Sequence, residues 1–89
     1  FDWREQEVTL LFKEEVVGSP TDLKVLGLTD REAEILHWIS MGKTDSEISL
    51  LCSISRRTVH KHTENIFLKL GVETRTSAAR RAIEAVSWV

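Results

Sequence analysis

The basic stretch formed by residues 55–70, SRRTVHKHTENIFLKL, has the spacing of an amphipathic helix. Its inward side is predicted to contain four residues at helical spacing, Val59, His62, Ile66 and Leu70. Arg57, Lys61 and Glu64 fall on the opposite side, and His60 and Asn65 flank them. The outward face near the start of this helix is therefore cationic and rich in hydrogen-bonding groups.

Such a face fits the major groove of DNA, which admits one helix and displays different donors and acceptors on each base pair. Lys61 and Arg57 can donate to guanine O6 and N7, and Glu64 can accept from cytosine N4. His60 can donate or accept at a base edge. Because base edges are contacted mainly from the start of such a helix, we expect residues 57–64 to carry recognition and residues 66–70 to hold the fold together.

The charge distribution supports this interpretation, although the net charge of the 89 residues is −2. Residues 1–54 contain five basic and eleven acidic residues, a net charge of −6. Residues 55–89 contain seven basic and three acidic residues, a net charge of +4. Because affinity for a polyanion depends on local neutralisation of phosphates, the second part can bind DNA despite the total charge.

Further short helices with explicit start signals must position the basic helix. Thr29 with Glu32, and Thr44 with Glu47, have the spacing of capping boxes, and Gly42 supplies a left-handed end between them. The second of these helices is short, and its predicted apolar side consists of Ile48, Leu51 and Cys52. A short helix, a turn of about four residues and a longer basic helix form the helix-turn-helix arrangement, which residues 29–41 would brace.

The last helix is predicted to begin near Thr74 or Thr76, after Gly71 ends the basic helix. It has an apolar stripe that we expect to form a homodimer contact, made by Ala79, Ala82, Ile83 and Val86. A chain this short buries only roughly 60% of its unfolded surface, so a second copy would add to its stability.

Residues 1–25 are predicted to form an N-terminal helix and linker, and residues 26–89 the helix-turn-helix domain. A β-hairpin is the alternative for the N-terminal part, because EVTLLF is also strand-like. The stretch GSPTDLKVLG is predicted to be a linker. Since the chain begins at Phe1, we expect it to be a piece of a longer protein whose upstream domain ends in residues 1–25.

Three segments, LTDREAEIL, GKTDSEIS and ISRRTVHKHTENIFLKLGVETRTSA, resemble the DNA-binding domain of LuxR/FixJ-type (GerE-like) regulators over about residues 26–87. The matching positions are Leu28, Thr29, Arg31, Glu32, Gly42, Glu47, Ile48, Ser55, Thr58, Val59, His62, Ile66, Lys69, Leu70 and Arg75. The resemblance implies an all-α, four-helix helix-turn-helix bundle in a sequence-specific transcription regulator. Its third helix would enter the major groove, and its fourth would form a homodimer contact. An attached phosphoacceptor or ligand-binding domain would control it.

The resemblance also implies DNA contacts at matching positions: His60, Lys61 and Glu64 at bases, Thr58 and Lys69 at phosphates, and Val59 packed at the groove. Helical spacing places Val59 in the core instead, and the two interpretations agree if it lies at the boundary. Lys69 also fits a favourable charge at the end of its helix. The predicted DNA-binding residues are Ser55, Arg56, Arg57, Thr58, Val59, His60, Lys61, Glu64, Asn65 and Lys69.

Four positions depart from the family pattern. Ser49 stands where alanine is usual, Cys52 where leucine is usual, and Ser53 where a turn glycine is frequent. Ser49 and Cys52 are small enough for close packing, whereas Ser53 can strain the turn. Glu64 stands where a basic or polar residue is often found. This departure affects the expected affinity for DNA and not the expected fold.

Two other functions fit parts of the pattern. The promoter-reading region of a sigma factor shares the EIS–turn–TV pattern, but the tail KLGVETRTSAA with a further amphipathic helix favours the LuxR/FixJ type. A protein-interaction module that no longer binds DNA is the second alternative, supported by the acidic first half and by Glu64.

An enzyme is not expected, because the sequence has no glycine-rich phosphate loop and no recognisable catalytic triad. His60 and His62 point about 200° apart on a helix, so they cannot join Cys52 in a zinc site, and neither metal nor cofactor is predicted. No apolar run reaches the roughly 18 residues that a membrane span needs. The expected partners are double-stranded DNA, a second copy and RNA polymerase, in the cytoplasm, where a single cysteine stays reduced.

Overall fold

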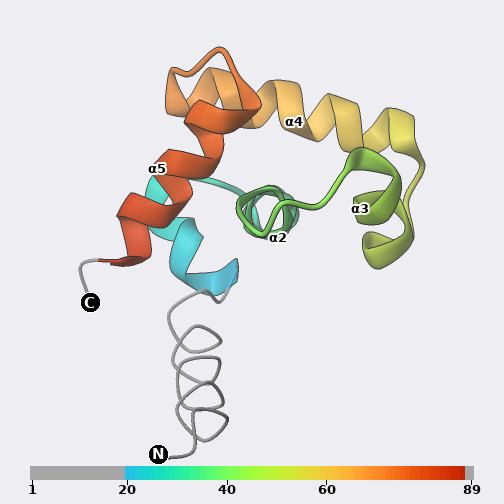
Figure 1. Cartoon of the computed structure of the whole chain (residues 1–89), viewed down its shortest axis with the longest axis horizontal. Coiled ribbons are helices and arrows are strands. Elements are labelled where there is room, and N and C mark those ends of the chain that lie inside the picture. Colours follow the sequence, from blue (N-terminus) through green and yellow to red (C-terminus); the bar gives the residue numbers. More distant parts are fainter. Residues whose placement is uncertain (1–19, 88–89) are drawn as a thin grey trace, which may run out of the picture.

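A computed structural model describes residues 20–87 as four α-helices after a 3₁₀ helix, without a strand in this range (Figure 1). The elements are η1 (Pro20–Leu26), α2 (Asp30–Ser40), α3 (Asp45–Cys52), α4 (Arg56–Leu70) and α5 (Arg75–Ser87). The predicted all-α class and four-helix bundle are confirmed. The helix or hairpin expected within residues 1–19 lies outside the described residues. The description begins with η1.

The helices α2 and α3 begin where the sequence predicts. Thr29 Oγ1 accepts from the Glu32 amide at 3.2 Å, and Glu32 Oε1 accepts from the Thr29 amide at 3.0 Å. Thr44 and Glu47 form the same reciprocal pair before α3, at 3.2 and 2.8 Å. Both capping boxes are confirmed, and each satisfies two backbone amides that a helix start leaves without partners.

The ends of α2 and α4 are set by glycines in the left-handed conformation. Gly42 has a φ of 83°, and its amide donates to Ile39 O while the amide of Lys43 donates to Trp38 O. This pair of bonds is a Schellman motif, which a residue with a Cβ accommodates poorly. Gly71 ends α4 with a φ of 69°. Both predicted helix ends are confirmed.

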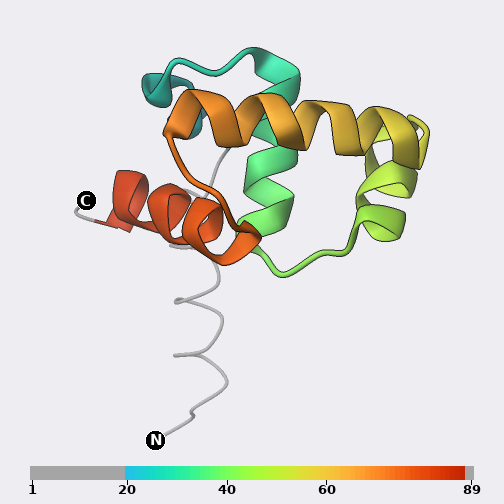
Figure 2. The same cartoon turned by 90° about the horizontal axis from the view of Figure 1, so that it is seen from above.

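Helix α2 runs through the centre of the molecule. It is seen end-on in Figure 1, where α4 runs across the view, and Figure 2 shows it crossing beneath α4. The largest fully buried side chains come from three helices and are Ile35, Leu36, Ile48, Val59 and Ile66. Because α2 contacts η1, α3, α4 and α5, it is the common support of the helix-turn-helix pair and of the last helix.

Helix α3 has a narrower buried side than its sequence predicts. Ile48 and Cys52 are buried, as expected, but Leu51 is 48% exposed. Leu51 therefore does not belong to the buried side of α3, which corrects its place in the predicted apolar side. Helix α3 has only about two turns, so the stripe that it buries is narrow. Ile48 and Cys52, four residues apart, lie within this stripe, and Leu51 lies at its edge.

The segment expected to be a linker is structured from Pro20 onward. It forms η1, in which Leu23 is buried in the core and Leu26 packs partly against it. The amide of Gly27, at a φ of 83°, donates to Lys24 O and closes the segment. The linker prediction missed these contacts because proline and glycine mark the ends of a 3₁₀ turn as well as those of a loop.

Helix α5 begins as predicted, since Thr74 Oγ1 accepts from the Ser77 amide at 3.0 Å just before its first residue. Its expected dimer stripe is divided by the fold. Ala82 is 2% exposed and packs inside the domain, Ala79 packs partly against the same core, and Ile83 is 51% exposed. Ala82 therefore cannot form a dimer contact, which corrects that part of the stripe. The side chain of Val86 is not among those described.

Candidate nucleic-acid interface

The turn before α4 is three residues long, slightly shorter than the expected four, and occupies residues 53–55. Ser53 adopts the left-handed conformation, with a φ of 56° and a ψ of 42°, as its place in the turn predicts. The amides of Ser53 and Ile54 both donate to Ser49 O. These two hydrogen bonds close the turn tightly and fix the direction of α4 relative to α3.

Ser55 caps the start of α4. Its Oγ accepts from the amide of Thr58 at 3.1 Å and lies 2.9 Å from the Thr58 hydroxyl. Both side chains are thus engaged in capping, and each still has hydrogen-bonding capacity on the outside of the molecule. Ser55 is thus the cap of α4, and the DNA contacts of Ser55 and Thr58 remain predictions.

The first half of α4 presents an open polar face. Arg56, Arg57, His60, Lys61 and Glu64 are all exposed, and Asn65 at their edge is half-buried. Helix α4 forms one edge of the molecule, with its first turns beside α3 and far from α5 (Figure 1). The side chains that line a shallow surface hollow on this face are Arg57, Thr58, His60, Lys61 and Glu64.

The cations on this face are free of carboxylate partners. Within residues 20–87, no aspartate or glutamate forms an ion pair with Arg56, Arg57 or Lys61. His60 Nε2 lies 3.8 Å from Glu64 Oε1, one helical turn away. Three positive charges on one exposed half-helix are therefore available to phosphates or to base acceptors.

Val59 belongs to the core and not to the interface. Its side chain is fully buried, and its carbonyl accepts from the Thr63 hydroxyl at 2.9 Å inside the bundle. Helical spacing therefore predicted Val59 correctly, while packing against DNA, expected from the resemblance, is excluded by its burial. His62 is half-buried, and its enclosed Nδ1 atom has no hydrogen-bond partner within residues 20–87.

Lys69 is engaged within the domain. Its Nζ donates to Glu32 Oε1 at 2.7 Å, and the Glu32 side chain is only 6% exposed. Burial by itself raises the pKa of Glu32, but the hydrogen bonds from Lys69 and Thr29 outweigh it, so the pKa lies below 4.5. Lys69 therefore joins α4 to α2, and its contact with a DNA phosphate remains a prediction.

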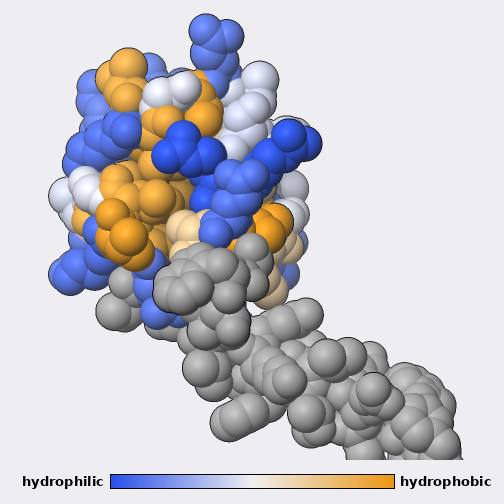
Figure 3. Space-filling view, turned by 90° about the vertical axis from the view of Figure 1, so that its left-hand side faces the viewer, coloured by the Kyte–Doolittle hydropathy of each residue, from blue (hydrophilic) through white to orange (hydrophobic). Residues whose placement is uncertain are grey.

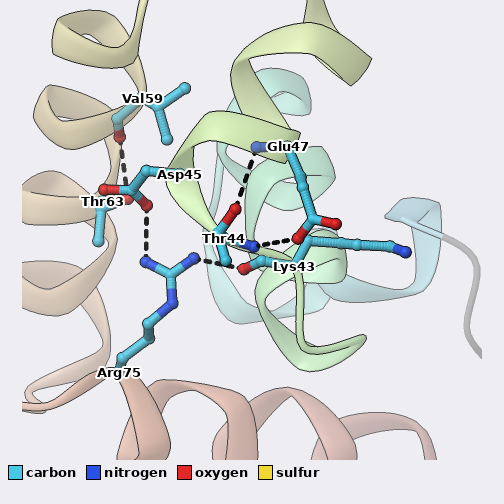
Figure 4. Close-up of polar contacts among 7 residues, drawn as sticks. All are labelled: Lys43, Thr44, Asp45, Glu47, Val59, Thr63 and Arg75. Carbon is cyan, nitrogen blue, oxygen red and sulfur yellow. Dashed lines mark hydrogen bonds and ion pairs between the residues drawn. The ribbon is translucent and has the colours of Figure 1, made fainter.

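Arg75 has a role that sequence reasoning did not identify. It donates from Nη1 to Asp45 Oδ1 and from Nη2 to Lys43 O, both at 2.7 Å (Figure 4). These bonds join the first residue of α5 to the start of α3, beside the Thr44–Glu47 capping box. In the sequence, the importance of Arg75 was indicated only by its match to the LuxR/FixJ pattern. Local spacing cannot indicate a contact between residues 30 positions apart.

Comparison with known proteins assigns this arrangement to a family. The family model for bacterial regulatory proteins of the luxR family (GerE) matches residues 26–82. This chain belongs to the luxR family. The family consists of helix-turn-helix transcription regulators that bind DNA, not of enzymes. The match continues beyond the helix-turn-helix pair into α5, which favours this family over a sigma-factor region.

Several transcriptional activator proteins resemble this LuxR-family chain. It is 47% identical over 68 residues to YukR of Yersinia ruckeri, covering 75% of this chain and 30% of YukR. It is 45% identical to EsaR of Pantoea stewartii subsp. stewartii and 48% identical to ExpR of Dickeya dadantii (strain 3937), covering 63% of this chain and 22% of each relative. The chain thus spans less than a third of these relatives' length. No solved structure matches it.

The described part of the LuxR-family chain, residues 20–87, holds no helix that is long and apolar enough to cross a membrane. Within the same residues, no three histidine, cysteine, aspartate or glutamate side chains are grouped as metal ligands would be.

Proposed function

We propose that this LuxR-family domain binds specific sequences of double-stranded DNA as the output domain of a transcriptional regulator, with the first half of α4 in the major groove. The observation that carries the proposal is the exposed face of Arg56, Arg57 and Lys61, whose charges have no partner within the described residues. A protein-interaction surface would not need unpaired cations at the start of a capped helix, whereas a phosphate backbone supplies their counter-charge.

The capped start of α4 supports the same placement. The Ser55 and Thr58 hydroxyls form an exposed contact at this start, and a helix start favours a phosphate oxygen. Phosphate contacts here would fix the register of the helix, so that His60, Lys61 and Glu64 meet base edges. Asn65 would contact DNA only from the edge of this face.

The partners of the whole protein follow from the same proposal. A dimer would place two copies of α4 on paired half-sites, and its contact would use the exposed Ile83 of α5 rather than Ala82. The names of the relatives, which are transcriptional activators, favour RNA polymerase as a further partner, encountered in the cytoplasm.

The test is binding of the chain to duplex DNA across a salt series. Fluorescence anisotropy is measured on a duplex selected from a random pool and on a shuffled duplex, at salt concentrations from about 50 to 200 mM. Affinity should fall steeply with salt for both duplexes, and the selected sequence should bind more tightly throughout. Salt-independent affinity, or no binding to any duplex, would contradict the proposal and favour a protein-interaction module.

A further inference from the structure

Three exposed side chains form a single row along the outward face of α4. Arg57, Lys61 and Glu64 are four and three residues apart, and they line the same hollow. At 1.5 Å per residue, the row extends over roughly 10 Å of helix. Base pairs are spaced by about 3.4 Å, so the row matches about three of them.

Glu64 is the acidic member of this row, and no lysine or arginine of the described residues neutralises its charge. Within residues 20–87, no lysine or arginine pairs with its carboxylate, and His60 lies 3.8 Å away. The other acidic side chains packed near the helix-turn-helix pair are engaged elsewhere, as Glu32 is with Lys69 and Asp45 with Arg75. Glu64 therefore reaches the binding face with only the long contact to His60 among the described ion pairs.

A free carboxylate in the major groove distinguishes the bases sharply. Ionised glutamate only accepts hydrogen bonds, and cytosine presents a lone amino donor at N4. Guanine presents only acceptors, thymine an acceptor and a methyl group, and adenine sets its N7 acceptor beside its amino donor. Next to a phosphate the same carboxylate would only repel, but Glu64 lies in line with Lys61, which our proposal directs at base edges.

We infer that Glu64 determines the specificity of this domain by selecting a cytosine, at a fixed distance from a guanine contacted by Lys61. The two side chains are roughly 4.5 Å apart along the helix, which places the two base pairs one to two steps apart. The inference rests on the proposed function and names the bases that it selects. Glu64 thus excludes sequences that a wholly basic face would accept.

The experiment compares binding sites selected from one random duplex pool by the wild-type chain, by Glu64→Gln and by Glu73→Gln. Glutamine pairs with adenine through N6 and N7, so Glu64→Gln should replace the selected cytosine with adenine. Titrations at one salt concentration should show wild type preferring cytosine by roughly tenfold at that position, and E64Q preferring adenine by a similar factor. Glu73 is exposed in the loop after α4, so E73Q removes the same charge and should keep the cytosine.

The outcomes separate the two proposals. An unchanged base preference in E64Q, or a uniform gain in affinity for all sequences, overturns the role of Glu64 and leaves DNA binding intact. No binding by the wild-type chain to any duplex overturns both. Because Glu64 is exposed and its ion pair with His60 is long, E64Q should keep the circular dichroism spectrum of the wild type.

Discussion

At the scale of single residues, Lys61 and Lys69 show how the same side chain takes different roles on one helix. Lys61 is exposed at the middle of the outward face, and no carboxylate within residues 20–87 holds it. Lys69 lies two turns farther on, where the helix faces α2, and it neutralises the buried Glu32. Their positions around and along α4, rather than their chemistry, leave Lys61 exposed and give Lys69 a structural ion pair.

Lys61→Ala should weaken binding to the selected duplex by about 1–3 kcal/mol and relax the preference for guanine at one position. The fold should persist, because the side chain makes no ion pair inside the domain. Anisotropy titrations against the selected duplex and single-base variants measure both effects. Arg80→Ala removes an exposed positive charge from α5 and is the control. An unchanged site preference in K61A would exclude Lys61 from base recognition.

Lys69→Met should lower the free energy of unfolding at pH 7 by about 1–3 kcal/mol, because it leaves the Glu32 carboxylate buried without its cation. In the wild type the pKa of Glu32 is below its ordinary value of 4.5. Its contribution to stability is therefore present above pH 4.5 and is lost as the pH falls through the folded-state pKa.

Without Lys69, the hydrogen bond and the charge that lower the pKa of Glu32 are lost, so this pKa rises and the loss in acid should shrink in K69M. Urea denaturation at a series of pH values from 7 to 3 measures the difference. The variant should retain the base preference of the wild type. Wild-type stability together with a changed preference would return Lys69 to the DNA interface.

At the scale of elements, the three-residue turn decides how α3 and α4 work together. Its first residue, Ser53, is the only non-glycine residue with a positive φ within residues 20–87. A side chain costs roughly 1 kcal/mol in this conformation, and glycine avoids that cost. The domain therefore carries some strain at the joint between its two motif helices.

Ser53→Gly should raise the free energy of unfolding by about 0.5–1 kcal/mol, because relief of the left-handed strain exceeds the added entropy of the unfolded chain. Thermal and urea denaturation measure the change. Ser55→Ala is the opposite case, since losing the cap of α4 should destabilise the domain by about 1 kcal/mol. If S53G is no more stable than the wild type, the Ser53 side chain must stabilise the fold by an amount that offsets the strain of its backbone.

At the scale of the whole molecule, the domain has an apolar area on the side that carries α5. Figure 3 views that side and shows hydrophobic residues gathered among hydrophilic ones. Ile83 on α5 is 51% exposed, while Ala78 and Ala82 on the same helix close the core beneath it. Among the α5 side chains that the structure describes, residues 75–85, Ile83 is thus a large apolar side chain that stays exposed.

Ile83→Lys should weaken self-association and should remove cooperative binding to a duplex with two half-sites, since it puts a charge in the proposed dimer contact. Leu50→Lys is the matched control, because Leu50 is also highly exposed but belongs to α3. Light scattering over a range of concentrations and titration of one- and two-site duplexes measure the effects. A wild-type chain that stays monomeric and binds one copy per site would contradict a dimer.

The sequence by itself determined the features that arise between near neighbours in the chain. Capping boxes join residues three positions apart, and glycines end α2 and α4 through bonds within one turn, so Thr29, Thr44, Gly42 and Gly71 could be interpreted correctly. The helical repeat likewise separated the buried Val59 from the exposed Lys61. The resemblance to LuxR-type regulators added the fold, because it extends across all four α-helices.

Only the tertiary structure decided which side chains are engaged in contacts between helices. Lys69 pairs with a residue 37 positions away and Arg75 with one 30 positions away, and no local pattern encodes such distances. The same holds for Leu51, left exposed because α3 is short, and for Ala82, covered because α5 packs on α2 and η1. Packing in three dimensions therefore decides which of the charged and apolar side chains stay exposed and which are engaged inside the domain.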